Sequence, residues 1–572
     1  MVSARDEPAV WRFRWPGRIL VRRTEMVRGR LATIQGYAQS SGGLPHSFEP
    51  MGSERRGGTK LDGRDGIVRI ARMAEHDLSR RAAGGWRLEH SYAQLPSLLH
   101  VAVGPTAVRA PRRVVWNRKL AEELGLDAAA WASADGAGAA GAEIFSGNVL
   151  PPGAVPLAQA YAGHQYGHFT TLGDGRAILL GEQITPRGER WDVQLKGAGP
   201  TPYSRSGDGR ATLGAMLREY VISEAMHAMG IPTTRSLAVV TTGEEVWRQD
   251  GARPGAVLTR VAASHIRVGT FEWVAARRDE GALRALVAYT LQRHYPELAC
   301  AENPPFALLG AVIERQARLI AQWMGVGFVH GVMNTDNMAL SGETIDYGPC
   351  AFMEAYDPAT VFSSIDRHGR YAYGNQPQIA QWNLARFAET LLSVVHPQEE
   401  AAVALANEAL GGFGERFQRH WLAGMRRKLG LFNEEPEDGA LIEALLTWMH
   451  AAKADFTNTW AELETLGETE AGRAREFQEW LARWQARRAR QPQTAEDVSR
   501  LRQANCPAVI PRNDRVEGAL AAAEQGDVSV LERLLAVLVA PYDYARARAA
   551  DVAEYRVPAP DGGEGYRTFC GT

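Results

Sequence analysis

The chain has 572 residues, of which 45% are hydrophobic and 23% charged, a composition ordinary for a globular protein. Its formal net charge is −2, so it carries no strong basic field, and nucleic acid is not an expected partner. No window reaches the roughly 18 uninterrupted apolar residues of a membrane helix, and the four cysteines are too widely spaced for a zinc site. We therefore expect a cytoplasmic monomer of roughly two to four domains that does not bind a membrane.

Residues 1–85 differ from the rest of the chain. The first thirty residues hold eight Arg against three acids, and Gly, Ser and Arg dominate residues 38–66. Neither helical nor strand periodicity persists there. We expect a disordered extension or a mis-assigned start, with Met73 as an alternative first residue. A transit peptide is disfavoured, because Asp6 and Glu7 are acidic.

From residue 86 the pattern is that of a folded chain. Residues 86–290 are predicted to be a strand-rich, nucleotide-binding region, with one amphipathic helix from about Thr212 to Met229. The runs predicted as strands include "RAILLGE" (176–182), "RWDVQLKG" (190–197), "RSLAVVTTGEEVWR" (235–248) and "GAVLTRVA" (255–262). Residues 291–490 are predicted to be helical, and residues 491–572 form a helical C-terminal extension. This order indicates an α+β, two-lobed protein-kinase-like fold.

A glycine turn and a strand lysine together favour a phosphate-binding element. Gly173 and Gly175 stand just before a predicted strand, and Arg176 follows them. Glycines let the backbone approach a phosphate, although such a turn alone is more typical of a hairpin. Lys196, in the next strand, is one of only five lysines in the chain. This order resembles the phosphate-gripping half of a protein kinase, with a surface lysine as the alternative.

The predicted helix after a second glycine turn offers a partner for this lysine. Glu219 lies on it, 23 residues after Lys196, and Glu224 is a competing candidate. A kinase glutamate of this kind holds the lysine over the phosphates. The second turn contains Asp208 and Gly209, and its amides can point from the helix N-terminus at an anionic oxygen.

Arg260 and Arg267 follow in and after the last predicted strand. A single strand arginine facing a cleft is more often an ion-pair partner than a phosphate clamp. Two of them, after two glycine turns and a lysine, favour the clamp.

The segment "HGVMNTDNMALSGETIDYGPC" (330–350) carries hard oxygen ligands. Asn337 and Asp346 suit Mg²⁺ or Mn²⁺, as do the catalytic-loop Asn and the Asp-Phe-Gly aspartate of a kinase. Asp336 can accept a hydroxyl proton. A kinase would show His-Arg-Asp here, with Asn five residues after Asp. This chain has His330-Gly-Val and an adjacent Asp-Asn pair, so the conventional catalytic aspartate is missing from its usual place.

His164 and His168 are four residues apart, a spacing that suits a helical metal pair. No third ligand or His-Glu-x-x-His context accompanies them. A structural role is therefore the favoured interpretation.

Several blocks resemble the selenoprotein O family of protein adenylyltransferases, a pseudokinase group. They include "FSGNVLPPGAVPLAQAYAGHQYGHF", "QLKGAGPTPYSRSGDGRATLGAMLREY", "HGVMNTDNM" and "IDYGP", and the resemblance runs from about residue 88 to the C-terminus. It implies a kinase-like fold with family-specific insertions that holds ATP inverted. AMP would then pass to a Ser, Thr or Tyr hydroxyl of a protein, and pyrophosphate would leave.

The resemblance also implies roles for matching positions. Asp336 would accept the proton, Glu219 would orient Lys196, and Asn337 with Asp346 would bind Mg²⁺ or Mn²⁺. Contacts to the nucleotide would come from Gly173, Gly175, Arg176, Lys196, Asp208, Gly209, Arg260, Arg267 and Asp346.

Alternatives stay open at this point. Uridylyl transfer from UTP with Mn²⁺, ordinary phosphoryl transfer and an inactive nucleotide-binding scaffold are the competing functions. Some relatives are described with a regulatory disulfide between the segment after the Asp-Tyr-Gly and the chain's tail. A Cys350–Cys570 bridge would be its counterpart, and two unrelated reduced cysteines are the favoured alternative.

Overall fold

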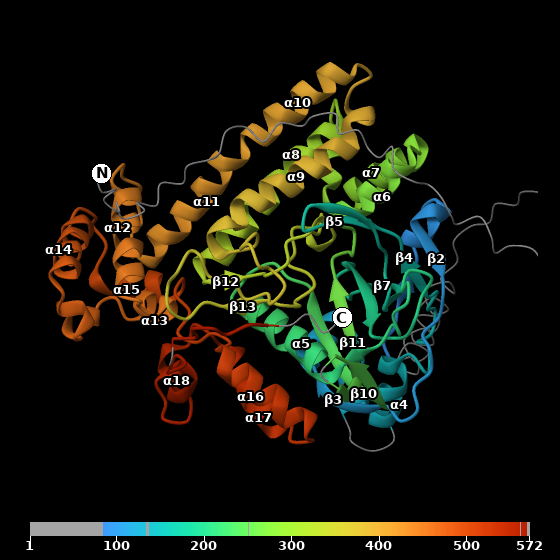
Figure 1. The fold of residues 1–572 in the computed structure, drawn as a ribbon, viewed down its shortest axis with the longest axis horizontal. Helices are drawn as coiled ribbons and strands as arrows, with labels where there is room; N and C mark the ends of the chain where they lie inside the picture. Colours follow the sequence, from blue (N-terminus) through green and yellow to red (C-terminus); the bar gives the residue numbers. More distant parts are fainter. Residues whose placement is uncertain (1–83, 133–136, 250, 561, 569–572) are drawn as a thin grey trace, which may run out of the picture. The chain divides into compact units, whose positions relative to one another are not determined.

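One large antiparallel sheet and many helices make up the protein from Trp86 onward (Figure 1). The computed structural model describes residues 84–132, 137–249, 251–560 and 562–568. The predictions made for residues 1–83 and for Cys570 concern positions outside these ranges.

In the described ranges the large sheet has nine strands, and every pairing in it is antiparallel. Its main path is β2-β4-β7-β8-β11-β10-β3, with β1 beside β7 and β9 beside β11. The strands are β1 (Leu88–Glu89), β2 (His100–Ala102), β3 (Arg112–Trp116), β4 (Leu157–Gln159), β7 (Ala177–Ile184), β8 (Arg190–Lys196), β9 (Ala211–Thr212), β10 (Arg235–Arg248) and β11 (Gly251–Ala262). The four quoted strand predictions are confirmed as β7, β8, β10 and β11, which are consecutive neighbours in the sheet.

Both faces of the central strands are covered, because successive side chains on a strand point to opposite sides. Ile178 and Leu180 of β7 join an apolar cluster with Leu120 and Phe145, from the helices after β3. Leu179, between them, joins the larger cluster on the other face, where the predicted helix 212–229 is confirmed as α5 (Leu213–Ala228). The helices on the first face are α2 (Arg118–Leu124), α3 (Ala128–Ala132) and α4 (Ala137–Ser146). The central strands are therefore buried on both sides, as their continuous apolar runs require.

After β11 the chain is mainly helical. The helices are α6 (Val268–Arg277), α7 (Glu280–His294), α8 (Pro304–Gly325), α9 (Gln376–Val395), α10 (Glu399–Gly411), α11 (Phe413–Lys428), α12 (Asp438–Ala451), α13 (Phe456–Ala461), α14 (Arg475–Arg488), α15 (Ala495–Gln503), α16 (Asn513–Glu524), α17 (Ser529–Leu538) and α18 (Tyr544–Ala547). Two hairpin-like pairs add β5 (Ala162–Gln165) with β6 (His168–Thr171), and β12 (Phe328–Val329) with β13 (Ala351–Phe352). Among the described residues, no helix combines the length and apolar composition needed to cross a bilayer.

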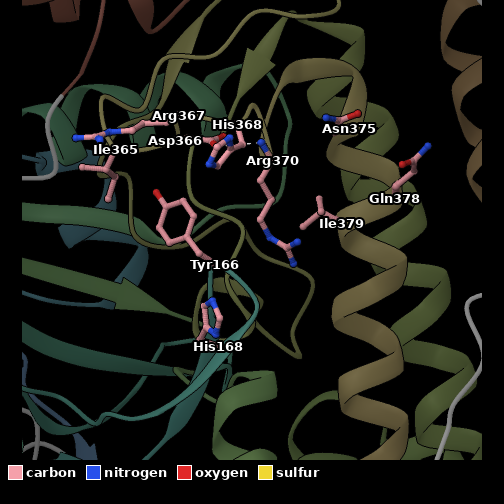
Figure 2. Close-up of a pocket in the computed structure, with 10 residues that line it drawn as sticks. All are labelled: Tyr166, His168, Ile365, Asp366, Arg367, His368, Arg370, Asn375, Gln378 and Ile379. Carbon is pink, nitrogen blue, oxygen red and sulfur yellow. Dashed lines mark hydrogen bonds between the residues drawn. The ribbon is translucent and has the colours of Figure 1, made fainter.

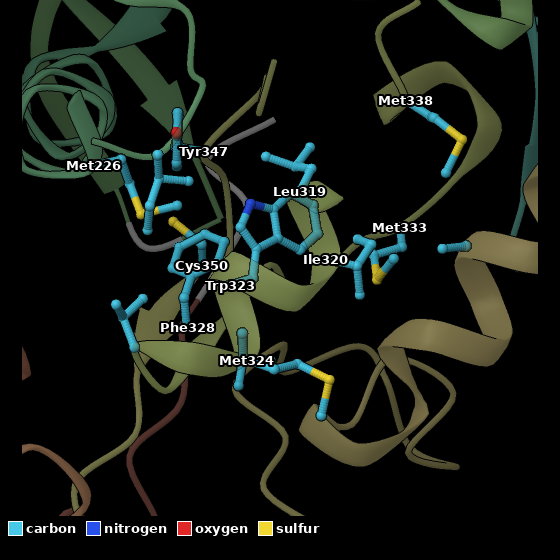
Figure 3. Packing of buried hydrophobic residues seen from close by; sticks show 14 of the residues in the cluster. Met226, Leu319, Ile320, Trp323, Met324, Phe328, Met333, Met338, Tyr347 and Cys350 are labelled. Atoms are coloured by element: carbon cyan, nitrogen blue, oxygen red, sulfur yellow. The ribbon is translucent and has the colours of Figure 1, made fainter. Parts of the chain in front are cut away.

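The C-terminal end of α8 forms a core beneath segment 330–350 (Figure 3). The Trp323 ring lies 5.5 Å from that of Phe328, and Phe328 lies 6.1 Å from Tyr347. Trp323 also donates a hydrogen bond of 2.8 Å to the hydroxyl of Thr344. These contacts fix the backbone on both sides of Asp346.

The helices α16 and α17 pack against α5 (Figure 1). Glu524 accepts a hydrogen bond of 3.2 Å from the backbone of Gly214, in the first turn of α5, and pairs with Arg253 at 3.2 Å. Glu517 pairs with Arg218 on α5. The C-terminal part of the chain therefore braces the helix that carries Glu219.

We expect Trp323→Ala to lower the free energy of unfolding by about 3–5 kcal/mol, because it empties a fully packed site. Urea denaturation followed by circular dichroism measures this difference. Trp247→Ala is the matched control, since Trp247 is 72% exposed, and its cost should stay below about 0.5 kcal/mol. Equal costs for the two variants would contradict this description of the core.

Glu343 generates a prediction about pH. Burial raises the pKa of Glu343 from 4.5 to about 7, although Ser341 and the amide of Ala263 donate hydrogen bonds to its carboxylate. A raised pKa in the folded state stabilises the protein at low pH, and this contribution is lost as pH rises through about 7. We expect Glu343→Gln to be neutral near about pH 5 and to raise the melting temperature near about pH 8. A variant that is equally stable relative to wild type at both pH values would refute the assignment.

Candidate active site

A cleft of about 530 Å³ brings most of the predicted site residues together. Those that line it are Gly173, Gly175, Arg176, Lys196, Asp208, Gly209, Arg260, Asp336, Asn337 and Asp346. The remaining two, Glu219 and Arg267, are buried directly behind lining residues. Residues more than 170 positions apart in the sequence therefore share one cavity, and their individual roles stay predictions.

The two glycine turns need glycine for steric reasons of their own. Gly173 has a φ of 132°, and a Cβ there would lie 2.4 Å from the ring of Tyr203. Gly209 has a φ of 66°, and its Cβ would collide with the backbone of Gly199 at 2.1 Å. Both turns are therefore held against residues 199–204. Because neither Gly173 nor Gly209 has room for a side chain, both contribute only backbone atoms to the lining of the cleft.

Lys196 and Glu219 form a buried ion pair. Lys196 is the last residue of β8, and its Nζ lies 2.6 Å from Oε2 of Glu219 on α5. Glu224, the competing candidate, instead pairs with Arg235 at 2.8 Å. The structure therefore places Glu219, and not Glu224, beside the lysine.

Three cations converge on the carboxylate of Asp346. Its Oδ1 lies 2.8 Å from Nζ of Lys196 and 2.5 Å from Nη1 of Arg260, and its Oδ2 lies 3.1 Å from Nη1 of Arg267. Burial favours the neutral acid, but the three positive charges hold the pKa of Asp346 well below its usual range. Asp346 also has a φ of 60°, a left-handed conformation that Asp tolerates better than most residues.

Arg267 joins the two halves of segment 330–350. It is the residue before α6, and its Nη1 also donates a hydrogen bond of 3.0 Å to the backbone oxygen of Asp336. Its guanidinium lies 4.3 Å from the ring centroid of Tyr161. Only 1% of Arg267 is exposed, so it supports the cleft from behind.

Asp336 is buried where the hairpin β5–β6 meets segment 330–350. A Cβ on Gly163 would lie 2.2 Å from Oδ1 of Asp336, so only glycine fits there. This Oδ1 is buried and has no hydrogen-bond partner among the described residues. Burial raises the pKa of Asp336 to about 7. A carboxylate with this pKa that lines the cleft is suited to accept a proton near neutral pH.

A hydrogen-bonded triad fixes the position of Asp336. Glu272 on α6 accepts hydrogen bonds of 2.6 Å from the hydroxyl of Thr335 and lies 2.6 Å from Nδ1 of His164. The hydroxyl of Thr335 in turn accepts a hydrogen bond of 2.6 Å from the backbone amide of His164.

The helical interpretation of His164 and His168 is wrong. Both belong to a β-hairpin whose two-residue turn places them on different strands, and His164 has the structural role that we favoured.

The cleft supplies two hard oxygen ligands. Asn337 uses its Nδ2 to donate a hydrogen bond of 2.9 Å to the backbone oxygen of Val332, while Asp346 keeps 22% of its side chain exposed. Among the described residues no group of three or more His, Cys, Asp or Glu is arranged to hold a metal. Mg²⁺ commonly takes one or two protein ligands and completes its shell with substrate phosphates and water, so these two residues fit it.

Sequence reasoning gave no role to several residues of the cleft. Asp174 is buried between the two glycines of the first turn, where it accepts hydrogen bonds from the amide of Gln159 and the side chain of Gln194. Burial raises the pKa of Asp174 to about 6. Arg248 reaches the cleft from β10 and pairs with Asp208 at 2.9 Å. The place of Asp174 between two glycines of a predicted phosphate-binding turn could have indicated that it lines the cleft. Nothing in the sequence near Arg248 indicated that its side chain lines the cleft.

Only one of the two cysteines of the proposed disulfide belongs to the described residues. Cys350 is fully buried, and Cys570 lies outside them. The last described part of the tail runs beside a different segment, because the amide of Thr568 donates a hydrogen bond of 2.8 Å to the oxygen of Phe362. Ser363 and Thr568 also form an isolated parallel β-bridge between their backbones. A Cys350–Cys570 bridge stays a prediction.

Comparison with known proteins agrees with this site. The family profile described as "Protein adenylyltransferase SelO" matches residues 87–539. Curated relatives named "Protein nucleotidyltransferase YdiU" come from Alkaliphilus metalliredigens (58% identical over 491 residues), Halalkalibacterium halodurans (59% over 492) and Syntrophotalea carbinolica (58% over 491). Each alignment covers 85% of this chain and 98% of the relative.

These matches define the chain as a nucleotidyltransferase, a transferase whose cleft is the candidate nucleotide site. Within that class it belongs to the protein adenylyltransferase SelO family.

We expect Glu219→Gln to lower kcat/KM for the nucleotide about 10- to 100-fold, since it removes a charge-assisted hydrogen bond from both Lys196 and Arg260. Steady-state kinetics with varied nucleotide concentration measures the change. Glu224→Gln, one turn further along α5, is the matched control. It should lower the melting temperature, because Glu224 pairs with Arg235, while kcat/KM stays near wild type. Equal kinetic losses in the two variants would contradict the assignment.

Proposed function

We propose that this protein transfers AMP from ATP to Ser, Thr or Tyr hydroxyls of other proteins and releases pyrophosphate. The single observation that carries the proposal is the convergence of Lys196, Arg260 and Arg267 on Asp346 at the inner end of the cleft. Three buried cations form a site for a group with several negative charges, and a triphosphate is such a group. The relatives' names, which specify protein nucleotidyltransferase, support the same class of substrate.

The proposed architecture is a two-lobed, protein-kinase-like fold. Residues 86–290 would form the nucleotide-binding lobe, 291–490 the helical lobe and 491–572 the extension. The ion pair between a strand lysine and a helix glutamate supports this, as does the position of Asp346 opposite that lysine. We propose that the enzyme acts as a cytoplasmic monomer.

The proposed reaction places the far end of the triphosphate deepest. Arg260 and Arg267 are 2% and 1% exposed, so the charge that they can neutralise lies at the bottom of the cleft. The α-phosphate would then face the opening, where an acceptor hydroxyl can approach it. Neutralising the departing pyrophosphate is the largest electrostatic demand of such a transfer, and preorganised buried cations meet it without reorganisation.

Mg²⁺ or Mn²⁺, held by Asn337 and Asp346, would supply further neutralisation of the phosphate charge. Asp336 would take the proton from the acceptor hydroxyl. Its pKa of about 7 lets it be ionised in a large fraction of molecules at neutral pH and still hold the proton once transferred. Arg267 and the Thr335–Glu272 hydrogen bond hold it in place for this step.

The experiment compares ATP labelled at the α- or the γ-phosphate, with intact-mass analysis of the protein and an added acceptor mixture. We expect α-label and the mass of AMP to be retained on protein, and Asp346→Ala to reduce this about 100-fold or more. Asp527→Ala, a loop variant before α17, is the control and should keep full activity.

Retention of the γ-label would establish phosphoryl transfer instead, and retention of neither label would indicate a scaffold. Replacing ATP by UTP with Mn²⁺ in the same assay distinguishes uridylyl transfer, because the added mass then corresponds to UMP.

A further inference from the structure

A second pocket, of about 570 Å³, lies beside the cleft (Figure 2). It is formed by the turn of the hairpin β5–β6, by the segment 365–370 and by the first turn of α9. None of the residues that line it takes part in the nucleotide site described above.

The pocket and the cleft are separated by one turn of chain. Gln165 lines the cleft, and its neighbour Tyr166 lines the pocket. Asn334, which lines the cleft, accepts hydrogen bonds from the amide of Tyr166 at 3.1 Å and from the hydroxyl of Tyr371 at 2.6 Å. Tyr166 has a φ of 51°, a conformation that costs free energy in a bulky residue and is retained mainly where the surroundings impose it. A ligand in the pocket would therefore lie next to the mouth of the catalytic cleft.

The pocket has an excess of positive charge. Two arginines, Arg367 and Arg370, line it against a single carboxylate, Asp366, and His168 and His368 complete its polar lining. Both oxygens of Asp366 are already occupied, because they accept the backbone amides of Arg370 at 2.9 Å and Tyr371 at 2.8 Å. Among the described residues, neither arginine forms a salt bridge with a carboxylate.

The guanidinium of Arg370 is held in a fixed orientation. Its Cζ lies 4.9 Å from the ring centroid of Trp382 and 5.7 Å from that of Tyr371. Its Nε is buried and has no hydrogen-bond partner among the described residues. Figure 2 shows the group projecting between His168 and Ile379. An arginine whose planar group is fixed by aromatic contacts is preorganised for a planar anion such as a carboxylate.

The start of α9 forms one wall of the pocket. Asn375, Gln378 and Ile379, from its first turn and the residue before it, line the pocket. The side chain of Asn375 donates a hydrogen bond of 2.8 Å to the backbone oxygen of Gly369. The two arginines, beside a single carboxylate whose oxygens already accept backbone amides, thus point to an anionic ligand.

We propose that this pocket binds an Asp or Glu side chain of the protein acceptor, close in sequence to the hydroxyl that receives the nucleotide. The proposal rests on the function proposed above and names its substrate class: hydroxyl residues flanked by acidic ones. The pocket selects such segments by a charge-assisted hydrogen bond to Arg370, with Arg367 adding electrostatic attraction at the rim.

The test uses synthetic peptides with one Ser, Thr or Tyr and a Glu, Gln or Lys placed at each of the neighbouring positions in turn. Transfer of α-label from ATP gives kcat/KM for each peptide. We expect wild-type enzyme to favour Glu over Gln by about tenfold at one or more positions, and Arg370→Gln to reduce the ratio to near one. Arg367→Glu, at an exposed residue whose loss does not endanger folding, should shift the preference toward Lys. Arg483→Gln, an exposed residue of α14, is the control and should keep the wild-type preference.

Two results would overturn the inference while leaving the proposed function intact: a wild-type enzyme that modifies the peptides without preferring acidic flanks, or an acidic preference that survives both Arg370→Gln and Arg367→Glu. An enzyme that attaches AMP to itself but to none of the acidic peptides would also overturn it. Failure of the proposed function is distinct, since no protein or peptide would then retain α-label.

Discussion

A carboxylate surrounded by three cations is the interaction around which the catalytic half of this protein is organised. Asp346 meets Lys196 from β8, Arg260 from β11 and Arg267 from the start of α6. Buried guanidinium groups are tolerated only when they are paired, so every element that supplies one must stay in register with the others. The antiparallel pairing of Arg260 with Gln194 and the apolar contacts beneath Tyr347 maintain this register.

The same cluster gives the proposed reaction a simple electrostatic basis. Asp346 and Glu219 offset part of the charge of Lys196, Arg260 and Arg267, and in the proposed reaction the remaining positive charge would face the phosphates of the nucleotide. The positive charge then need not be assembled during catalysis, because it is already placed and desolvated. Asp336, which also lines the cleft, depends on the cluster less directly, since Arg267 holds its backbone while Gly163 limits the space around its carboxylate.

Local patterns in the sequence were sufficient for the strands β7, β8, β10 and β11 and for α5, because alternation and helical periodicity report burial directly. At His164 and His168 the spacing of four also suited a helical metal pair, the disfavoured interpretation, and the hairpin turn at Tyr166-Gly167 excludes it, while His164 has the favoured structural role. The family was correctly identified from its motifs, and the predicted site residues line one cleft except for Glu219 and Arg267, which lie behind its wall. Arg248, Glu272 and the pocket around Arg370 could not be foreseen, since their neighbours are set by contacts across 40 or more positions of sequence.

The bracing of α5 by α16 and α17 connects the carboxyl-terminal region with the catalytic lysine. Glu517 and Glu524 of α16 contact the same helix that presents Glu219. In enzymes where such a helix swings, its movement switches activity on and off. Here contacts from α16 and α17 hold the outer side of the helix while Glu219 is paired with Lys196. Shortening the protein after α15, for crystallisation or fusion, would therefore alter the chemistry and not only the solubility.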